Sequence, residues 1–578
     1  MNTAAIHHRS TAEFCYAVDN DTVVITLKTA KDVTRAFIIW EDPFIHELRR
    51  CAWEGERKEM DLYIELPEHY IWRTEIVPKF KRVMYYFVVE GGSKEYSVFE
   101  NKITPSEEAD ISAKQFFKFP WLNPSDVIRT PEWVRDTVWY QIMPDRFCRS
   151  SDSPDDDKFR PWGKFSDPGW HDFFGGNLNG IKERLPYLKR LGISGIYMTP
   201  IFLSNSNHKY NTHDYKMVDP DFGTEEELIA LIEEAHSMGI RIMLDAVFNH
   251  CGDKFGPWLD VRKNGKASPY YDWFMINSDN FTDDRRPTDD ARFYSFSFWP
   301  VMPKLNTNNP EVISYFTDIC LHWAKIWKID GIRFDVGDEV SHTFLRSVYS
   351  ALKQVSPDIF LLGEIWNDSL TWVTSKEYDS VMNYPFCSCS DNFWSVPTQN
   401  STDFMYAINY CRSLYPSQVT NVLFNFLDTH DTDRAIEHCA NEDVLLQKLA
   451  VLLTMPGTPC IYYGTEIAMH GKLNPYNRAC MPWKDIEAGR YDEMFEKVRA
   501  LISIRNSESS LRSGEIEFCR FAEYPRLLCY NKSNKTRVYI NAEDNAVPIT
   551  DNGRVLYSNG YSGTQLKKDG ILIIACEL

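Results

Sequence analysis

The sequence predicts an α/β protein built on a (β/α)8 TIM barrel, with β-rich segments before and after it. From residue 138 to about 504, short apolar runs alternate with amphipathic helical patterns, which is typical of parallel strands joined by helices. Residues 1 to about 120, and those past about 505, instead show strand-like runs separated by polar turns. The gap between the third and fourth strands is too long for a loop and too rich in proline, aspartate and aromatic residues for a helix. We therefore expect a small inserted domain over the barrel mouth there.

The length of 578 residues also requires more than one hydrophobic core. We expect an N-terminal β-sandwich over residues 1–122 and a barrel over 123–248 and 310–504. The inserted domain should cover 249–309, and a C-terminal β-domain should cover 505–578.

The N-terminal segment has apolar runs of strand length. They are Val23–Leu27, Ala36–Trp40, Leu62–Leu66 and Val83–Val89. This pattern predicts a small β-sandwich, a shape used for carbohydrate binding and for contacts between subunits. A rigid structural appendage is an equally good interpretation of this segment alone.

The barrel segment contains eight strand candidates. They are Val138–Met143, Ile193–Met198, Ile240–Val247, Gly331–Asp335, Ile359–Glu364, Ser380–Asn383, Val422–Leu427 and Cys460–Tyr463. Helical patterns lie between them, at Ile181–Leu191, Glu225–Met238, Pro310–Trp327 and Phe344–Val355. After the barrel, strand-like runs return at Phe518–Phe521, Leu527–Tyr530, Arg537–Ile540 and Ile571–Ala575.

Composition and charge restrict the kind of partner. A net charge of −19 argues against nucleic acid and anionic membranes, because both are bound through basic patches. No run of about 18 apolar residues occurs, and the N-terminus lacks the apolar core of a signal peptide. The 14 cysteines include no Cys-x-x-Cys pair, so we expect reduced, packed thiols in a cytoplasmic protein.

The stretch Gly331–Val336 carries an unusual pair of charges. Arg333 and Asp335 alternate with three apolar residues, so in a strand the two charged side chains share one face. Burying them is expensive unless they are paired. One interpretation is a structural ion pair; the other is a carboxylate whose charged form is held ready by a neighbouring cation.

The predicted barrel brings further charges to the same place, because the C-terminal ends of its strands meet at one mouth. The polar residues at these ends are Asp245, Asn249, His250, Arg333, Asp335, Glu364, His430 and Asp431. Such clustering of charges that desolvate one another favours a functional site over a structural ion pair.

Four of these stretches resemble the signature regions of the α-amylase superfamily, glycoside hydrolase family 13. They are Asp245-Ala-Val-Phe-Asn-His250, Gly331-Ile-Arg-Phe-Asp335, Gly363-Glu-Ile-Trp366 and Phe426-Leu-Asp-Thr-His-Asp431, in the family's order. Tyr140-Gln-Ile-Met-Pro-Asp-Arg-Phe147 and Met302-Pro-Lys-Leu-Asn306 are similar to the neopullulanase, cyclomaltodextrinase and maltogenic amylase branch. That branch also has an N-terminal β-sandwich, so the resemblance covers essentially the whole chain.

The resemblance implies a role for each of three carboxylates. Asp335 would be the nucleophile, Glu364 the general acid/base and Asp431 the stabiliser of the transition state. A retaining glycosidase needs an ionised carboxylate beside the anomeric carbon, and Arg333 favours that form. It also needs a second carboxyl that starts protonated, so we expect Glu364 in a drier setting.

The resemblance also implies substrate contacts. Trp366 would dry the acid/base or stack on a leaving sugar, and His250 and His430 would bind sugar hydroxyls. Tyr210, in Asn207–Tyr215, would stack under the reacting sugar; its alternative is a loop tyrosine that fills a gap. Arg478 matches a family arginine that contacts sugars farther along the non-reducing side.

Some residues depart from the family pattern. Many relatives hold Ca²⁺ near the first strand, but here Cys148–Ser151 and Gly175–Leu178 replace its ligand stretches, and Arg149 is a cation. Ca²⁺ needs several hard oxygens, so we expect no metal and no cofactor. Asp152 and Asp155–Asp157 could substitute as ligands, although a solvated acidic loop is the simpler interpretation. Three further replacements, Thr465, Asn367 and Asn474, are expected near the sugar subsites.

The resulting hypothesis is a retaining α-glucan hydrolase that cleaves α-1,4, and some α-1,6, bonds in maltooligosaccharides, cyclodextrins and pullulan. An α-1,6-glucosidase or a transglycosylase stays open as an alternative, since the same carboxylates serve all of these. A non-catalytic carbohydrate-binding scaffold is the alternative from another class, against which the three intact carboxylates argue. By resemblance the N-terminal domain would form a homodimer.

Overall fold

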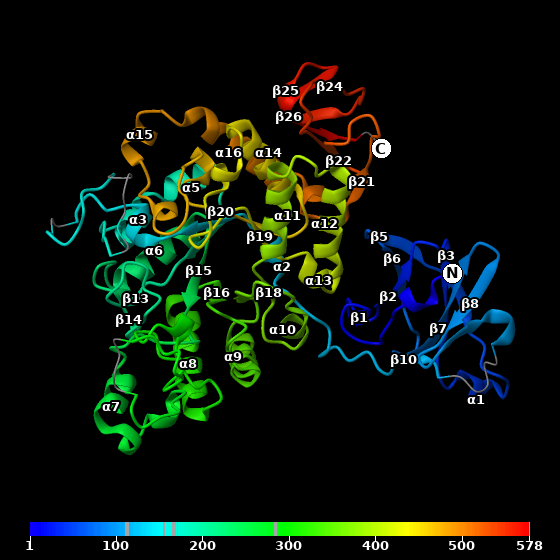
Figure 1. Ribbon diagram of the computed structural model, residues 1–578, viewed down its shortest axis with the longest axis horizontal. Coiled ribbons are helices and arrows are strands. Elements are labelled where there is room, and N and C mark those ends of the chain that lie inside the picture. The colour runs from blue at the N-terminus through cyan, green and yellow to red at the C-terminus, as the bar shows by residue number, and fades with distance from the viewer. Residues whose placement is uncertain (110–114, 154–155, 164–168, 170, 282–285, 577–578) are drawn as a thin grey trace. The chain divides into compact units, whose positions relative to one another are not determined.

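The structure is a computed structural model that describes residues 1–578 except 110–114, 154–155, 164–168, 170, 282–285 and 577–578. The described residues form two compact units (Figure 1). The first contains Met1–Arg129 and Thr402–Thr420, and the second contains Thr130–Ser401 and Asn421–Leu578. Across the described residues, no helix has the length and apolar character that a bilayer crossing requires.

The first unit contains two antiparallel sheets. One has the strand order β1-β2-β6-β5, and the other has the order β4-β3-β7-β8-β9 with β10 added beside β7. The strands are β1 (Cys15–Ala17), β2 (Val23–Ala30), β3 (Arg35–Glu41), β4 (Glu56–Glu59), β5 (Asp61–Glu65), β6 (His69–Ile76), β7 (Val83–Gly91), β8 (Lys94–Val98), β9 (Ile103–Pro105) and β10 (Phe117–Phe119). This arrangement confirms the predicted N-terminal β-sandwich.

The core of this unit follows from strand alternation. Alternate residues of β2 and β7, among them Ile25, Leu27, Tyr85 and Phe87, lie in one apolar cluster. The helix α12 (Ser401–Ser413) and the short α13 (Ser417–Thr420) contribute residues to the unit, although they come from late in the chain.

The second unit is built on a closed parallel sheet. Among the described residues, eight strands pair in the order β18-β17-β16-β15-β12-β11-β20-β19, and a parallel bridge between Met382 and Phe424 joins the two ends. The strands are β11 (Trp139–Ile142), β12 (Gly195–Met198), β15 (Arg241–Ala246), β16 (Gly331–Phe334), β17 (Phe360–Gly363), β18 (Ser380–Val381), β19 (Phe424–Phe426) and β20 (Thr458–Tyr462). Each overlaps a predicted strand, and the predicted (β/α)8 barrel is confirmed.

The helices around the barrel differ from the predicted ones in two places. The predicted helix Ile181–Leu191 is two helices, α4 (Leu178–Glu183) and α5 (Leu185–Leu191), because Pro186 cannot continue the hydrogen bonding of α4. The predicted helix Pro310–Trp327 is α8 (Pro310–His322) followed by a π-helical turn at Trp323–Trp327. Two others, α6 (Glu225–Ser237) and α9 (His342–Val355), match their predictions.

Residues 249–309 contain more helix than the sequence suggested. Despite its proline, α7 (Gly256–Asn264) forms, with Pro257 in its first turn, where a missing N–H costs nothing. Trp258 packs on Phe274 and Phe293, with ring centroids 4.8 and 5.1 Å apart. The aromatic residues of this segment therefore supply a small core of their own.

The C-terminal sheet, red in Figure 1, has the order β21-β22-β23-β26-β24, and β25 pairs with β26. Its strands are β21 (Glu517–Cys519), β22 (Leu527–Lys532), β23 (Thr536–Asn541), β24 (Val547–Pro548), β25 (Arg554–Tyr561) and β26 (Gln565–Ala575). It is attached to α14 (Glu442–Thr454), where Gln447 Nε2 donates to the Asn541 carbonyl at 2.8 Å.

Candidate active site

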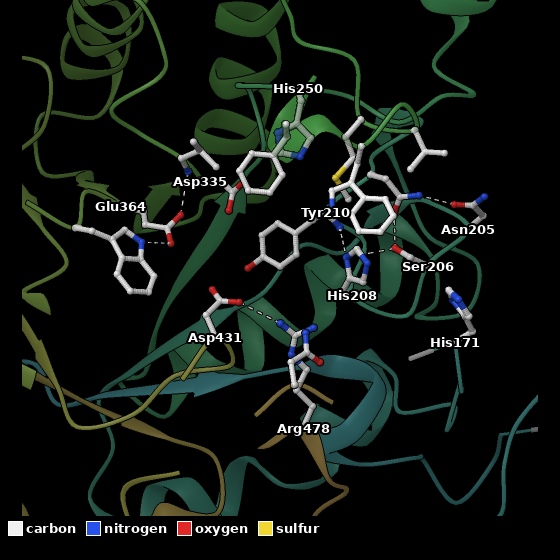
Figure 2. Close-up of a pocket in the computed structure, with 18 of the residues that line it drawn as sticks. His171, Asn205, Ser206, His208, Tyr210, His250, Asp335, Glu364, Asp431 and Arg478 are labelled. Atoms are coloured by element: carbon white, nitrogen blue, oxygen red, sulfur yellow. Dashed lines mark hydrogen bonds and ion pairs between the residues drawn. The ribbon is translucent and has the colours of Figure 1, made fainter. Parts of the chain in front are cut away.

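The predicted site residues meet because their strands end at the same level. Asp335 directly follows β16, and Glu364 directly follows β17. Asp431 lies a few residues beyond β19, and His250 lies beyond β15. Figure 2 shows these side chains around one cavity, which has a volume of about 910 Å³.

Seven of the predicted site residues line this cavity. They are Tyr210, His250, Asp335, Glu364, Trp366, Asp431 and Arg478. The other two, Arg333 and His430, are buried beneath it and contact residues that line it. Of the three family departures expected near the subsites, only Asn474 lines the cavity.

Arg333 is the cation beneath the cavity. Its Nη1 donates to Asp245 at 2.8 and 2.9 Å and to Asp335 Oδ1 at 2.8 Å. Its Nη2 forms an ion pair with Glu364 Oε2 at 2.7 Å. One buried guanidinium thus holds three carboxylates, and charges removed from water need such pairing.

This excess of negative charge affects the proton affinity of the carboxylates. Burial raises the pKa of Asp335 well above the ordinary aspartate value, and the neighbouring Glu364, Asp245 and Asp431 raise it further. Arg333 opposes these effects and favours the ionised form, as expected from the sequence. Burial likewise raises the pKa of Asp245, which Arg333 and two tyrosine hydroxyls oppose.

A hydrogen-bond chain fixes Tyr210 at the cavity wall. Gln141 Nε2 donates to His430 Nδ1 at 2.7 Å, which leaves the His430 proton on Nε2. Nε2 lies 2.7 Å from the Tyr210 hydroxyl, and that hydroxyl donates to Asp245 Oδ2 at 2.9 Å. Burial and the nearby Arg478 hold the pKa of His430 well below its usual value, so the chain works with a neutral imidazole.

Glu364 has different partners on its two oxygens. Oε2 accepts the backbone N–H of Val336 at 2.9 Å in addition to the Arg333 ion pair. Oε1 has only longer contacts, 3.2 Å from Trp366 Nε1 and 3.3 Å from the Tyr384 hydroxyl. Trp366 stacks on Tyr384 at 3.8 Å and leaves half of its surface exposed.

Val336 has a backbone conformation that β-branched residues rarely adopt. Its φ is +46°, in the left-handed region that disfavours a side chain branched at Cβ. This conformation directs the Val336 N–H at Glu364. Unusual backbone geometry of this kind concentrates at functional sites.

Asp431 and Arg478 form the opposite wall. Arg478 Nη2 donates to Asp431 Oδ1 at 3.1 Å, and its Nε donates to the His430 carbonyl at 2.8 Å. The side-chain amide of Asn474 is oriented so that its oxygen accepts from Arg478, at 3.0 Å from Nη1. Asp431 is the most open of the three carboxylates, with a third of its side chain exposed.

Two histidines of the cavity are neutral donors or acceptors. Burial lowers the pKa of His250 and that of His208 to about 3. His250 stacks on Phe296 at 4.9 Å, and its buried Nε2 has no hydrogen-bond partner among the residues that the structure describes. Since buried polar groups are normally satisfied, this nitrogen is suited to a ligand hydroxyl.

Sequence reasoning did not single out several residues of the site. Cavity-lining residues of this kind include His171, Asn205, Ser206, His208, Phe296, Trp299, Val301 and Asp338. Gln141 and Tyr197, which position His430 and Asp245, were also missed. His208 lies in the same stretch as Tyr210, and the aromatic density of residues 293–299 was a signal for Phe296 and Trp299.

The stretches Cys148–Ser151 and Gly175–Leu178, where the family resemblance led us to look for Ca²⁺ ligands, bond to each other. Asn177 caps α4 through the Gly180 N–H at 2.7 Å and donates to Ser150 and Ser153 at 3.2 and 2.6 Å. The Arg149 guanidinium lies 5.4 Å above the ring of Phe159. Asp155, a candidate ligand, lies outside the described residues.

Two family models match this chain. The alpha amylase catalytic domain matches residues 141–502, and the alpha amylase N-terminal Ig-like domain matches residues 1–123. Together they cover the sandwich and the barrel described above.

Individual proteins are similar over nearly the whole length. A cyclomaltodextrinase of Geobacillus thermopakistaniensis (strain MAS1) is 40% identical over 95% of this chain and 92% of its own. An intracellular maltogenic amylase of Bacillus subtilis is 39% identical over 90% of this chain and 87% of its own. The solved structure of a cyclomaltodextrinase superposes with a TM-score of 0.90 at 31% identity, covering 99% of this chain and all of that one.

Proposed function

The chain belongs to the alpha-amylase family of glycoside hydrolases, and on that premise we propose that it cleaves α-1,4 bonds in short and cyclic α-glucans with retention of configuration. Maltooligosaccharides, cyclodextrins and pullulan are the proposed substrates. The observation that carries the mechanism is the shared guanidinium of Arg333, which contacts both Asp335 and Glu364.

A shared cation keeps the two carboxylates close together. Retaining glycosidases hold their carboxyl groups about 5–5.5 Å apart, whereas inverting enzymes need about 6.5–9.5 Å to admit a water molecule. Two carboxylates that bind neighbouring nitrogens of one guanidinium fit the shorter spacing. This geometry supports a double displacement through a covalent glycosyl-enzyme.

In the first step Asp335 attacks the anomeric carbon while Glu364 donates its proton to the departing glycosidic oxygen. Oε1 is the proposed proton-bearing oxygen, because Oε2 is occupied by Arg333 and the Val336 N–H. In the second step water attacks the glycosyl-enzyme, and Glu364 now takes the proton from that water. Each step breaks one bond at the anomeric carbon and forms one.

The remaining residues bind the sugar. Asp431, held by Arg478, would accept hydroxyl protons more strongly as the ring flattens toward the oxocarbenium ion. The unpartnered Nε2 of His250 would meet a hydroxyl of the same ring. Tyr210 would stack beneath that ring, and the half-exposed Trp366 would face the leaving sugar.

We propose that no Ca²⁺ is required, because Asn177, Ser150 and Ser153 bond to one another and Arg149 is cationic. We also propose a cytoplasmic location, in line with the intracellular relative. We likewise propose that no organic cofactor takes part, because two carboxylates suffice for glycoside hydrolysis.

We further propose that the chain forms a homodimer through its N-terminal domain. The first unit exposes Phe44 and Trp121 by about half of their surface, with Arg82 lying 4.8 and 5.9 Å from their rings. Exposed apolar groups in such a cluster are typical of interaction surfaces.

Product chromatography after incubation with maltotriose, β-cyclodextrin, pullulan and starch tests the proposed function. We expect wild type to consume the first three faster than starch.

Asp335→Asn should lose on the order of 10³-fold or more in kcat, because it removes the nucleophile. Thr224→Ser, which keeps the hydroxyl that caps α6 and lies outside the cavity lining, is the control for handling. Near-normal turnover by Asp335→Asn would mean that the nucleophile is another residue, and release of transfer products alone would indicate a transglycosylase.

The pH profile of kcat/KM should show the raised pKa of Asp335. Attack needs the ionised carboxylate, and a raised pKa means that Asp335 takes up a proton at a higher pH than usual. Activity should therefore fall as the pH drops, with a midpoint above the ordinary aspartate value of 3.8. Because the carboxylates are coupled, this midpoint belongs to the cluster. An acid limb at or below 3.8 would contradict the electrostatic account.

Calcium should leave the protein unchanged. Melting temperature and kcat should be the same, within error, after EDTA dialysis and after addition of millimolar Ca²⁺. Mg²⁺ at equal ionic strength is the control for general salt effects. A rise in melting temperature that is specific to Ca²⁺ would refute the proposal.

Light scattering at micromolar concentration should give the mass of a dimer. Phe44→Glu should shift the mass toward that of the monomer, because burying an unpaired carboxylate in an interface is unfavourable. Leu259→Glu changes an exposed apolar residue of the second unit and is the matched control. A monomeric wild type would rule out the dimer.

A further inference from the structure

The C-terminal sheet places two cysteines directly opposite each other. Cys519 is the last residue of the edge strand β21, and Cys529 lies in its antiparallel neighbour β22. The register pairs Cys519 with Cys529. Directly opposed residues of antiparallel strands have Cα atoms about 4.5–5.5 Å apart, which lies within the range of about 4.4–6.8 Å that a disulfide spans.

The two thiols differ in exposure. Cys519 is partly exposed at the sheet edge, whereas Cys529 is buried in the apolar cluster of this domain. An oxidant in solution can therefore reach Cys519 first. Cys529 is held behind it without access of its own, which is the arrangement of an attacked thiol and a resolving thiol.

The surroundings of Cys519 favour its thiolate. Asn531 Nδ2 donates to Cys519 Sγ at 3.8 Å, and Asn531 Oδ1 in turn accepts from Arg537 Nε at 2.7 Å. A hydrogen bond from the Cys529 thiol and the charge of Arg537 lower the pKa of Cys519 to about 7, against the opposing effects of burial and of the charge of Glu517. Thiolates rather than thiols react with peroxides.

We propose that Cys519 and Cys529 form a reversible dithiol/disulfide site that hydroperoxides oxidise. This site is separate from the carbohydrate chemistry, and none of its residues lines the candidate active site. In the part of the chain that the structure describes, no group of three or more Cys, His, Asp or Glu side chains is arranged to hold a metal. A thiol pair of this kind is therefore suited to redox chemistry rather than to metal binding.

The reaction proceeds in two balanced steps. The Cys519 thiolate attacks one peroxide oxygen, the O–O bond breaks, and hydroxide leaves, so that Cys519 becomes a sulfenic acid. Cys529 sulfur then attacks Cys519 sulfur, the S–O bond breaks, and water is released as the S–S bond forms. The two thiols lose two electrons and two protons, and hydrogen peroxide is reduced to two water molecules, since the leaving hydroxide takes up the proton that Cys519 gave to solvent.

The change of charge at Cys519 prepares the second step. In the reduced pair, the hydrogen bond to the Cys519 thiolate raises the pKa of Cys529 above its usual value. Once Cys519 has become a neutral sulfenic acid, that thiolate is gone and its effect disappears, although burial still raises the pKa of Cys529. Cys529 can then lose its proton as the water departs.

Mass spectrometry of the full-length protein tests the proposal. After brief exposure to equimolar hydrogen peroxide, the intact mass should fall by two hydrogens, and dithiothreitol should restore it. A non-reducing peptide map should contain one cross-linked peptide that joins Cys519 to Cys529. Cys519→Ser and Cys529→Ser should each abolish the cross-link, whereas Cys51→Ser, at the exposed cysteine of the first unit, should retain it.

Two results would overturn the inference. In one, wild type gains oxygen atoms at Cys519 without any cross-link. In the other, the cross-link joins a different pair, for example Cys519 to Cys576. Because the wild-type map alone distinguishes these outcomes, the test does not depend on the folding of the serine variants. Alkylation of Cys519 by iodoacetamide should in addition rise with a midpoint near its pKa of about 7.

Discussion

The site depends on one buried guanidinium that must satisfy three carboxylates. Arg333 is fully buried, and Asp245, Asp335 and Glu364 all contact it. Three carboxylates around one cation would be unstable in a dry interior unless further donors contributed. Those donors are present: Tyr197 and Tyr210 bond Asp245, and the Val336 N–H bonds Glu364. The arrangement keeps Asp335 reactive, since within the described part of the chain only Arg333 donates to its side chain, at Oδ1, which leaves Oδ2 available.

The barrel explains how residues from distant parts of the sequence reach one cation. In β15, β16 and β17 the parallel register aligns Asp245 with Arg333 and Phe334 with Gly363. Asp335 and Glu364 then follow as the next residues of adjacent strands. Only glycine fits at position 363, because a Cβ there would come within 2.5 Å of the Tyr378 ring. Strand register and one close contact thus set the spacing of the two carboxylates.

Much of the fold and of the site could be predicted because the signals were local or repeated. Alternation placed the barrel strands, and the charges at their C-terminal ends placed Asp335, Glu364 and Asp431 around one cavity. Gln141 and Tyr197 escaped notice, since a polar or aromatic residue inside a buried strand has no sequence feature that shows its partner. The association of Thr402–Thr420 with the N-terminal residues was also hidden, because it is a long-range contact.

Among the described residues that line the cavity, Arg478 is the one arginine or lysine, and its charge is paired with Asp431. Burial holds His250, His208 and His430 unprotonated, and Arg333 lies beneath the cavity rather than in its lining. A neutral imidazole can both donate and accept a hydrogen bond, which matches the paired capacity of a hydroxyl. An oxocarbenium-like transition state carries positive charge, so cations in direct contact with the ring would oppose it. With the histidines neutral and Arg333 outside the lining, the carboxylates at the cavity supply a fixed negative field that stabilises the positive charge developing at the reacting carbon.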